Sequence, residues 1–214
     1  MLSLAALILL VCAQVSGQSV DNELWLDQNL SVRLLPKTAL QMKFAERADQ
    51  GASHLFQVFG QVGVSFQVKP WLAIAPIFRH DRDDPFDPNA HYENRPLLDI
   101  ITHRPRGALQ PILRTRIEGR FFENQAGFLS LRLRPGIDYR LPSKSRLQPG
   151  LFVDDEIFYD TRADTLNRNR LRAGASFRVN EHFSFRPYYM LESVRLPGLW
   201  DDDNIWGLSL FWRY

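Results

Sequence analysis

Apolar residues occupy every second position over most of this chain. In "FLSLRLRPGIDYRL" at 128–141, one face carries leucine, isoleucine and tyrosine, and the other carries serine, arginine and aspartate. The segments "NRNRLRAGASFRV" (167–179) and "LQPILRTRIEGRFF" (109–122) alternate in the same way. Successive side chains of a β-strand point to opposite faces, so this period of two predicts strands with one apolar face.

The same alternation recurs in about eleven runs, the others being 22–34, 38–46, 54–68, 71–79, 92–103, 147–159, 183–195 and 204–214. Each run has roughly 10–14 residues, whereas strands of globular proteins are most often about 5–6 long and membrane-spanning strands need about 9–11. No helical stripe of useful length follows Gln18. The pattern predicts an all-β fold, an antiparallel transmembrane-type β-barrel of about 10–12 strands.

The predicted connections alternate between short and long. Short ones lie at Lys69–Pro70, Arg104–Gly107, Pro142–Arg146 and Asn180–His182, and longer polar ones at His80–Ala90, Asp160–Asn167 and Leu196–Asp203. Outer-membrane barrels have short periplasmic turns and longer external loops, so this rhythm places Tyr214 on the periplasmic side. It also directs the first run toward the periplasm, which an even number of strands does not permit. We therefore expect either that one run is miscounted or that the first lies outside the wall.

The last run ends on large apolar residues at alternate positions, Trp206, Leu208, Leu210, Trp212 and Tyr214. A final strand that ends on an aromatic residue resembles the signal by which the barrel assembly machinery recognises its clients. The last strand must also close against the first, because an unpaired strand edge is not tolerated in lipid.

The first residues, "MLSLAALILLVCAQVSGQS", have the apolar stretch and the small residues of a secretory signal peptide. We expect residues 1–17 to be the signal peptide and 18–214 the barrel. A lipoprotein signal ending at Cys12 is the alternative, with Val11 at a position that prefers a smaller residue. On the main interpretation the exported chain has no cysteine, which excludes a disulfide framework.

A soluble β-sandwich or a lipocalin-like barrel also has strands with one apolar face. The length of the strands, the lack of a disulfide and the aromatic residues near the ends of the runs favour the membrane, because aromatic girdles mark both interfaces of transmembrane barrels. These aromatic residues are Trp71, Phe121, Phe122, Tyr159, Tyr188, Tyr189, Trp206 and Trp212. The predicted location is the bacterial outer membrane, with outer-membrane lipid as a partner.

Three segments are similar to a known family: "ENRPLLDI" (93–100), "LFVDDEIFYD" (151–160) and "NRNRLRAGASFRVNEHFSFRPYYM" (167–190). Together they resemble a family of Gram-negative exported proteins known only as a domain of unknown function. The positions that carry the resemblance are Glu93, Arg95, Pro96, Asp155, Glu156, Phe158, Tyr159, Asn167 or Asn169, Arg170 and Arg172. The resemblance implies a small outer-membrane barrel and supplies no activity.

The polar faces of the predicted strands are rich in charge, and 22 of the 26 basic residues of the chain are arginine. We expect the following side chains to face the lumen: Glu93, Asp99, Arg114, Arg116, Glu118, Arg120, Arg132, Arg134, Asp138, Arg140, Asp154, Glu156, Arg170, Arg172, Arg178, Arg186 and Glu192. An open porin channel takes about 16–18 strands, so charges in this narrower lumen must pair or face water. The first hypothesis is a structural or ligand-binding barrel, with a small anionic ligand as a possible partner. The alternative is a narrow transport barrel that favours anions.

A third hypothesis is an outer-membrane lipid hydrolase. His182 and Ser184 lie two apart in "EHFSF", but in a predicted turn and followed by Phe185 rather than a polar residue. We therefore predict no catalytic residue and no enzyme. The acidic segment "HDRDDPFDPNAH" lacks the glycine and the distal glutamate of a calcium loop and is predicted to be a solvated external loop, as are Asp201, Asp202 and Asp203. We expect no metal, no cofactor and, at a net charge of +2, no nucleic-acid partner.

Overall fold

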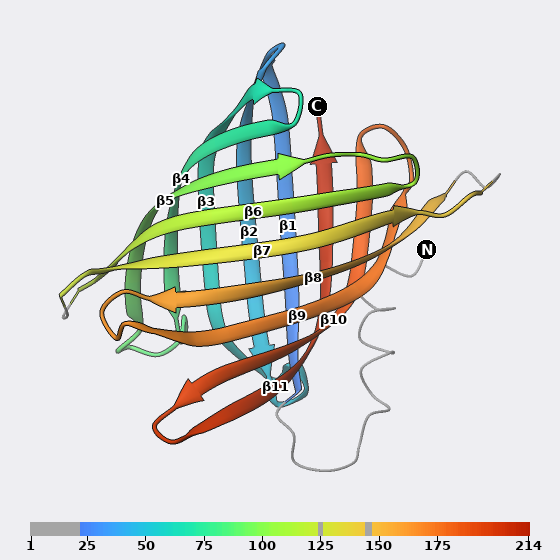
Figure 1. Ribbon diagram of the computed structural model, residues 1–214. Helices are drawn as coiled ribbons and strands as arrows, with labels where there is room; N and C mark the ends of the chain where they lie inside the picture. The colour runs from blue at the N-terminus through green and yellow to red at the C-terminus, as the bar shows by residue number, and fades with distance from the viewer. Residues whose placement is uncertain (1–21, 124–125, 144–146) are drawn as a thin grey trace.

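The computed structural model describes residues 22–123, 126–143 and 147–214. The expected signal peptide, Cys12 and part of the turn expected at Pro142–Arg146 lie outside these residues. Eleven strands form one closed barrel in which each strand is hydrogen-bonded to the next along the chain (Figure 1). They are β1 Asn22–Leu35, β2 Thr38–Asp49, β3 His54–Lys69, β4 Leu72–Asp83, β5 His91–His103, β6 Leu109–Phe122, β7 Phe128–Arg140, β8 Gln148–Asp160, β9 Thr165–Arg178, β10 Phe183–Leu196 and β11 Leu199–Arg213.

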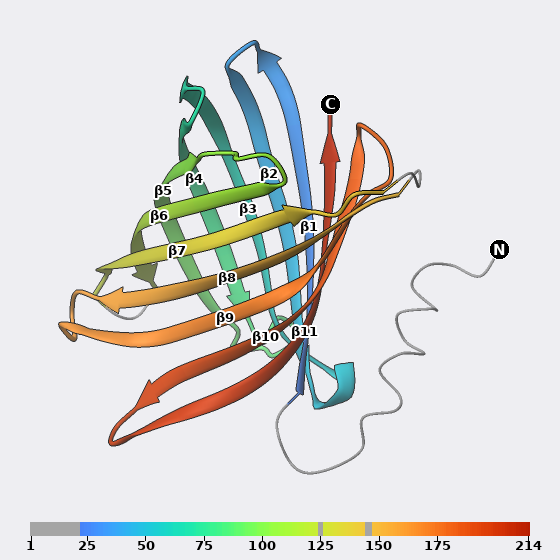
Figure 2. The same cartoon turned by 45° about the vertical axis from the view of Figure 1, so that its right-hand side comes forward.

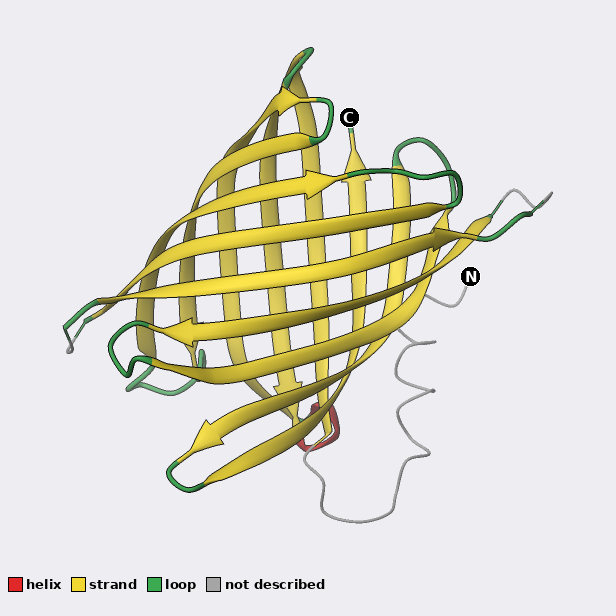
Figure 3. Ribbon diagram, in the orientation of Figure 1, coloured by secondary structure: helices red, strands yellow, loops and turns green. Residues whose placement is uncertain are grey.

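The strands are strongly tilted, as closure of a barrel requires. In Figure 1, β6–β9 run across the near wall and cross the nearly upright β1–β3 of the far wall. A single helical turn, Gln50–Ala52, interrupts the strands in the described part of the chain (Figure 3). Among the described residues there is no helix long and apolar enough to cross a membrane.

The barrel closes through a parallel pair, which the sequence did not predict. β1 and β11 pair from Asn22↔Asn204 to Ser31↔Arg213, and every other neighbouring pair is antiparallel (Figure 2). All eleven runs belong to the wall. The expectation of an even number of strands was therefore wrong, because an up-and-down barrel with an odd number has its first and last strands in the same direction. These two strands then pair only as parallel neighbours.

The two ends of the barrel are distinguished by the ends of the described chain. The Tyr214 end carries the connections after β1, β3, β5, β7 and β9, and the Asn22 end carries those after β2, β4, β6, β8 and β10. The predicted contrast of loop lengths was wrong. The connection expected at Leu196–Asp203 is the two-residue turn 197–198, and the one expected at Asp160–Asn167 is only 161–164. Gly198 has φ +87°, the left-handed conformation that this tight turn requires and that glycine adopts without strain.

The predicted alternation becomes a two-faced wall. Large apolar side chains are exposed around the outside, including Phe44, Phe66, Phe78, Leu113, Leu133, Leu151, Leu171 and Trp206. Buried charged side chains point into the barrel instead, among them Arg79, Glu118 and Arg132. The protein therefore has its polar core inside and its apolar surface outside, which is the arrangement of a barrel whose outer face meets lipid.

One apolar cluster lies inside the barrel, against the parallel seam. It consists of Trp25 on β1, Phe152 on β8, Tyr188 and Met190 on β10, and Ile205 on β11. The Tyr188 ring covers Gly207 so closely that a Cβ atom there would overlap the ring. Tyr188 was expected at the membrane interface, and the structure places it in the lumen, because it lies one position out of phase with outward-facing Tyr189. The cluster packs against the inner side of the parallel β1–β11 pair.

Candidate functional site

Two halves of the lumen differ in how tightly they are filled. Toward the Asn22 end, acidic side chains are fully enclosed, with Asp81 0%, Glu118 1% and Glu93 2% exposed. Toward the Tyr214 end the lining contains small residues (Ser65, Gly136, Gly150, Ser176 and Ser184), and the Asp138 and Arg186 side chains keep 20% and 29% of their surface. The interior is therefore a cup that is open at the Tyr214 end and largely filled by charged side chains at the Asn22 end.

The filled half is held by an ion-pair network, here called the plug. Asp81 binds Arg79 and lies 3.4 Å from Nε of Arg95, which also pairs with Glu93. Arg120 binds Glu93 through Nε–Oε1 (2.5 Å) and Nη2–Oε2 (2.8 Å). Because each carboxylate contacts more than one guanidinium, the plug holds together strands β4, β5 and β6.

Further ion pairs join β6 to β7 and β8, and β9 to β10. Arg132 on β7 pairs with Glu118 at 2.5 Å, and Arg114 on β6 pairs with Glu156 on β8 at 2.6 Å. Glu192 on β10 pairs with Arg170 and, at 3.0 Å, with Arg168. Buried charges are stable only when paired and hydrogen-bonded, and removing one partner of such a pair typically costs about 3–5 kcal/mol. The plug is thus a structural element as well as a polar surface.

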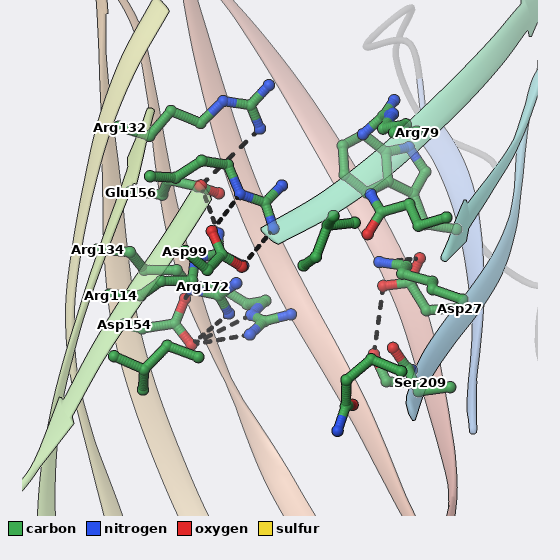
Figure 4. Close-up of a pocket in the computed structure, with 18 of the residues that line it drawn as sticks. Asp27, Arg79, Asp99, Arg114, Arg132, Arg134, Asp154, Glu156, Arg172 and Ser209 are labelled. Atoms are coloured by element: carbon green, nitrogen blue, oxygen red, sulfur yellow. Dashed lines mark hydrogen bonds and ion pairs between the residues drawn. The ribbon is translucent and has the colours of Figure 1, made fainter. Parts of the chain in front are cut away.

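The main cavity, of about 460 Å³, lies between the plug and the Tyr214 end. Ten cations and four carboxylates line it: Lys43, Arg47, Arg79, Arg114, Arg116, Arg132, Arg134, Arg170, Arg172 and Arg186 against Asp27, Asp99, Asp154 and Glu156. Figure 4 shows part of this lining, with Asp27 and Ser209 on one side of the cavity and Asp99, Asp154 and Glu156 on the other. Four of these arginines pair with carboxylates that do not line the cavity, namely Asp81, Glu118, Glu192 and Asp138. Two positive charges remain in excess, which suits an anion.

A smaller cavity of about 210 Å³ follows toward the Asn22 end. Arg47, Arg79, Arg132 and Arg170, from four different strands, line both this cavity and the main one. These four side chains, here called the arginine ring, separate the two spaces. Aromatic faces support the ring: Arg79 and Arg47 lie 3.5 Å from the ring centroids of Phe59 and Trp25, and Arg132 lies 4.4 Å from that of Phe158. Cation–π contacts of this kind stabilise a desolvated guanidinium.

A third space of about 180 Å³ lies on the Tyr214 side. Arg114, Arg134, Asp154, Arg172 and Arg186 line both it and the main cavity. The three spaces therefore follow one another along the barrel, with the arginine ring at one junction.

The structure places most of the predicted lumen residues in these networks. Besides those of the plug, Arg116 binds Asp99 through two contacts of 2.6 and 2.7 Å, and Arg186 pairs with Asp138 at 2.6 Å. Arg140 and Arg178 end their strands at the Tyr214 rim and are exposed. No ion pair within the described residues links either of them to the plug.

Sequence reasoning missed the lumen residues of β1–β4, namely Asp27, Lys43, Arg47, Arg79 and Asp81. Asp81 was assigned to a solvated loop, and the structure corrects this, because β4 continues to Asp83 and Asp81 is fully buried. The alternation of Arg79, Asp81 and Asp83 within "FRHDRD" was the available signal. Asp201, Asp202 and Asp203 likewise belong to β11 rather than to a loop.

The pair considered for lipid hydrolysis is not joined in the structure. His182 is exposed in the turn before β10, where its Nδ1 lies 2.7 Å from the carbonyl oxygen of Arg213 and its ring stacks on Tyr214 at 5.2 Å. No hydrogen bond between His182 and Ser184 is present in this fully described turn. Within the described ranges, no three His, Cys, Asp or Glu side chains are grouped as metal ligands would be.

The chain matches the model of a known protein family. The family described as "Protein of unknown function (DUF2490)" matches residues 22–202, from the start of β1 into β11. The chain belongs to this family. The resemblance inferred from the three segments is thereby confirmed at the level of an uncharacterised barrel family. None of the curated proteins matches the chain.

The positions that carry the resemblance take two different places in the barrel. Glu93, Arg95 and Glu156 belong to the plug. Asp155, the neighbour of Glu156, faces outward and accepts a hydrogen bond from Asn169 Nδ2 at 2.6 Å. These positions thus form both part of the lumen network and a polar pair on the outer wall.

Proposed function

We propose that this protein is a small outer-membrane barrel that binds a small anion in its lumen and is closed to passage by the plug. The observation that carries the proposal is the asymmetric interior, a basic cavity of about 460 Å³ backed by fully buried ion pairs. Pockets for small ligands typically have about 300–1,000 Å³. A cavity of this size and charge suits a small anionic metabolite.

The outer face supports the proposed location. Monomeric soluble proteins rarely expose an apolar patch larger than a few hundred Å², whereas here exposed leucine, isoleucine, valine and phenylalanine side chains surround the wall. Lipid acyl chains are the medium in which such a surface is stable. Exposed Trp71 and Tyr214 near one end and Phe121 and Trp200 near the other support this placement.

In the proposed orientation the Tyr214 end lies in the periplasm, where the strand that ends on Tyr214 would be recognised during assembly. The backbone supports a role for this end in closure, since Tyr214 N donates to the Ser31 carbonyl at 2.9 Å and Arg33 N donates to the Tyr214 carbonyl at 2.6 Å. In this orientation the open side of the cup receives its ligand from the periplasm.

The test uses the full chain purified from membranes in detergent. Heat-modifiable migration and detergent-dependent extraction are the expected marks of a folded membrane barrel. Thermal unfolding is then measured with increasing acetate, succinate, inorganic phosphate and, as a cationic control, choline chloride at constant ionic strength. Saturable stabilisation by at least one anion, with none by choline, supports the proposal. Extraction without detergent, or no anion-specific stabilisation, contradicts it.

Narrow anion transport is the second candidate, favoured by the succession of three spaces through the lumen. The arginine ring would then be the selectivity constriction. Conductance across a planar bilayer separates the two functions. We expect no steady conductance from the wild type, and a stable anion-selective current would instead assign the ring to transport.

A further inference from the structure

Two carboxylates in the main cavity each bind two cations. Asp27 on β1 lies 3.0 Å from Lys43 Nζ and 3.6 Å from Arg47 Nη2. Asp154 on β8 receives Arg134 Nε at 2.8 Å and Arg172 Nη2 at 2.9 Å. Each triad therefore carries one positive charge in excess. Figure 4 places Asp27 on one side of the cavity and Asp154, Arg134 and Arg172 on the other.

The first triad, Asp27–Lys43–Arg47, has hydrogen-bonding capacity left. Arg47 is buried, and its Nη1 has no hydrogen-bond partner among the described residues. Its guanidinium is fixed against the Trp25 ring with 3.5 Å to the centroid, so its direction is set before any ligand arrives. Lys43 carries three N–H donors and keeps 24% of its side-chain surface. A buried N–H group without a partner is unfavourable, and the partly exposed Lys43 side chain of the same triad lines the cavity, where it can meet an anion.

The second triad, Asp154–Arg134–Arg172, concentrates two guanidinium groups on one carboxylate. Arg134 contributes Nε and Nη2, and Arg172 contributes Nη2 at 2.9 Å and Nε at 3.3 Å. Each arginine has five N–H donors, so Asp154 accepts fewer than half of those present. Arg172 also lies 4.8 Å from the Tyr188 ring centroid, which holds it at the cavity wall.

We propose that the ligand of the main cavity carries two anionic groups, one bound at each triad. This inference rests on the proposed function, anion binding in the lumen, and adds the class of ligand. The two excess charges stand on opposite sides of a single cavity, so a dianion neutralises both, whereas a monoanion leaves one uncompensated. Carboxylate and phosphate groups both match the guanidinium fork. The shared chemistry is thus a short molecule with a carboxylate or phosphate at each end.

Calorimetry on the purified full-length barrel tests this with a series of linear dicarboxylates of three to eight carbons and the monocarboxylates of the same length. We expect one length of dicarboxylate to bind at least tenfold more tightly than its monocarboxylate. An organic bisphosphate of similar span distinguishes phosphate from carboxylate ends. Equal affinity of monoanions and dianions would overturn the dianion inference and leave anion binding standing. Binding of neither class would overturn both.

Variants locate the two ends. Lys43→Gln and Arg172→Gln, one in each triad, should each reduce the affinity for the best dicarboxylate at least tenfold, to the level of its monocarboxylate. Arg178→Gln is the matched control, since this arginine lies on β9 with Arg172 but is exposed at the Tyr214 rim and lines none of the three spaces. It should change the affinity less than threefold. Loss of affinity in only one triad variant, or an equal loss in the control, contradicts the two-point arrangement.

Asp154→Asn offers a gain rather than a loss. It removes a negative charge and leaves the two guanidinium groups in place, so it should bind the dicarboxylate more tightly than the wild type if it folds. Heat-modifiable migration establishes folding for each variant before calorimetry. If Asp154→Asn does not fold, Lys43→Gln and Arg172→Gln still carry the test, and Lys43→Gln is the milder change because its side chain is partly exposed. Unchanged dianion affinity in Lys43→Gln would then overturn the inference.

Discussion

Leu133 and Arg134 are neighbours in β7 and face opposite sides of the wall. The Leu133 side chain is 43% exposed on the outside. Arg134 points inward and binds both oxygens of Asp154, at 2.8 and 2.9 Å. Substitutions at these two positions therefore report separately on the medium outside and on the network inside.

Leu133→Arg places a charge on the outer face. In lipid, an arginine near the bilayer midplane of a barrel costs about 2–4 kcal/mol. On a water-exposed surface the same change falls within about 0.5 kcal/mol. Even the lower membrane value corresponds to a roughly 30-fold change in the folding equilibrium. The two media thus give clearly different results.

Arg134→Leu acts on the inside and does not depend on lipid. It removes the bidentate pairing with a charged group, an interaction worth about 1.5–3 kcal/mol. Asp154 keeps Arg172 at 2.9 Å and so is not left unpaired. We expect a total loss of about 1.5–3 kcal/mol, below the cost of isolating a buried charge.

The assay is urea unfolding in lipid vesicles, followed by tryptophan fluorescence, with Leu133→Ile as an apolar control. We expect the control to match the wild type and both test variants to unfold at lower urea. If Leu133→Arg is as stable as the control in vesicles, the outer face is not in lipid and the membrane placement is refuted. If Arg134→Leu is neutral, Asp154 does not need its bidentate partner, and the account of that triad is wrong.

Three further predictions follow from the seam and the ends. Gly207→Ala should destabilise the barrel by about 1–3 kcal/mol, the usual effect of overpacking. Gly60→Ala is the control and should be neutral or stabilising, because a Cβ atom there meets nothing within 4 Å; both variants are unfolded in vesicles. Tyr214→Ser should lower the amount of heat-modifiable protein in the outer membrane, because the terminal ring is lost, and wild-type levels would count against an assembly role. Single cysteines replacing Asp84 and Asn180 should react differently with an impermeant thiol reagent on intact cells, with Asp84→Cys labelled and Asn180→Cys protected; the reverse pattern would invert the orientation.

The fold was predictable from the sequence because apolar and polar residues alternate with a period of two along each strand, and these strands are long. Leu129, Leu131 and Leu133 identify an outer face without any knowledge of neighbours. The turn at 197–198 was also available, since a proline–glycine pair between two alternating runs is a strong turn signal, but the acidic residues after it were given more weight. Burial of Asp81 was missed for the same reason, because a dense group of charges in sequence suggests a loop.

The pairing inside the lumen was not predictable from the sequence. Arg114 meets Glu156 across 42 residues, and Arg186 meets Asp138 across 48. Which charges meet depends on how far each strand is shifted along its neighbour around the whole barrel. Arg134 likewise meets Asp154 on the neighbouring strand, 20 residues away. The parallel seam was equally hidden, since local alternation is the same for parallel and antiparallel neighbours.

The parallel seam also limits how this chain can be rearranged. In a barrel with an even number of strands the two termini lie side by side, and a short turn can join them in a circular permutant. Here Asn22 and Tyr214 lie at opposite ends of the wall. A linker between them would run beside β1, a strand of 14 residues or about 45 Å at the usual rise. If the linker ran through lipid, its backbone groups would lack hydrogen-bond partners. If it ran inside the barrel, it would displace the ion pairs. A short linker therefore cannot produce a circular permutant of this barrel.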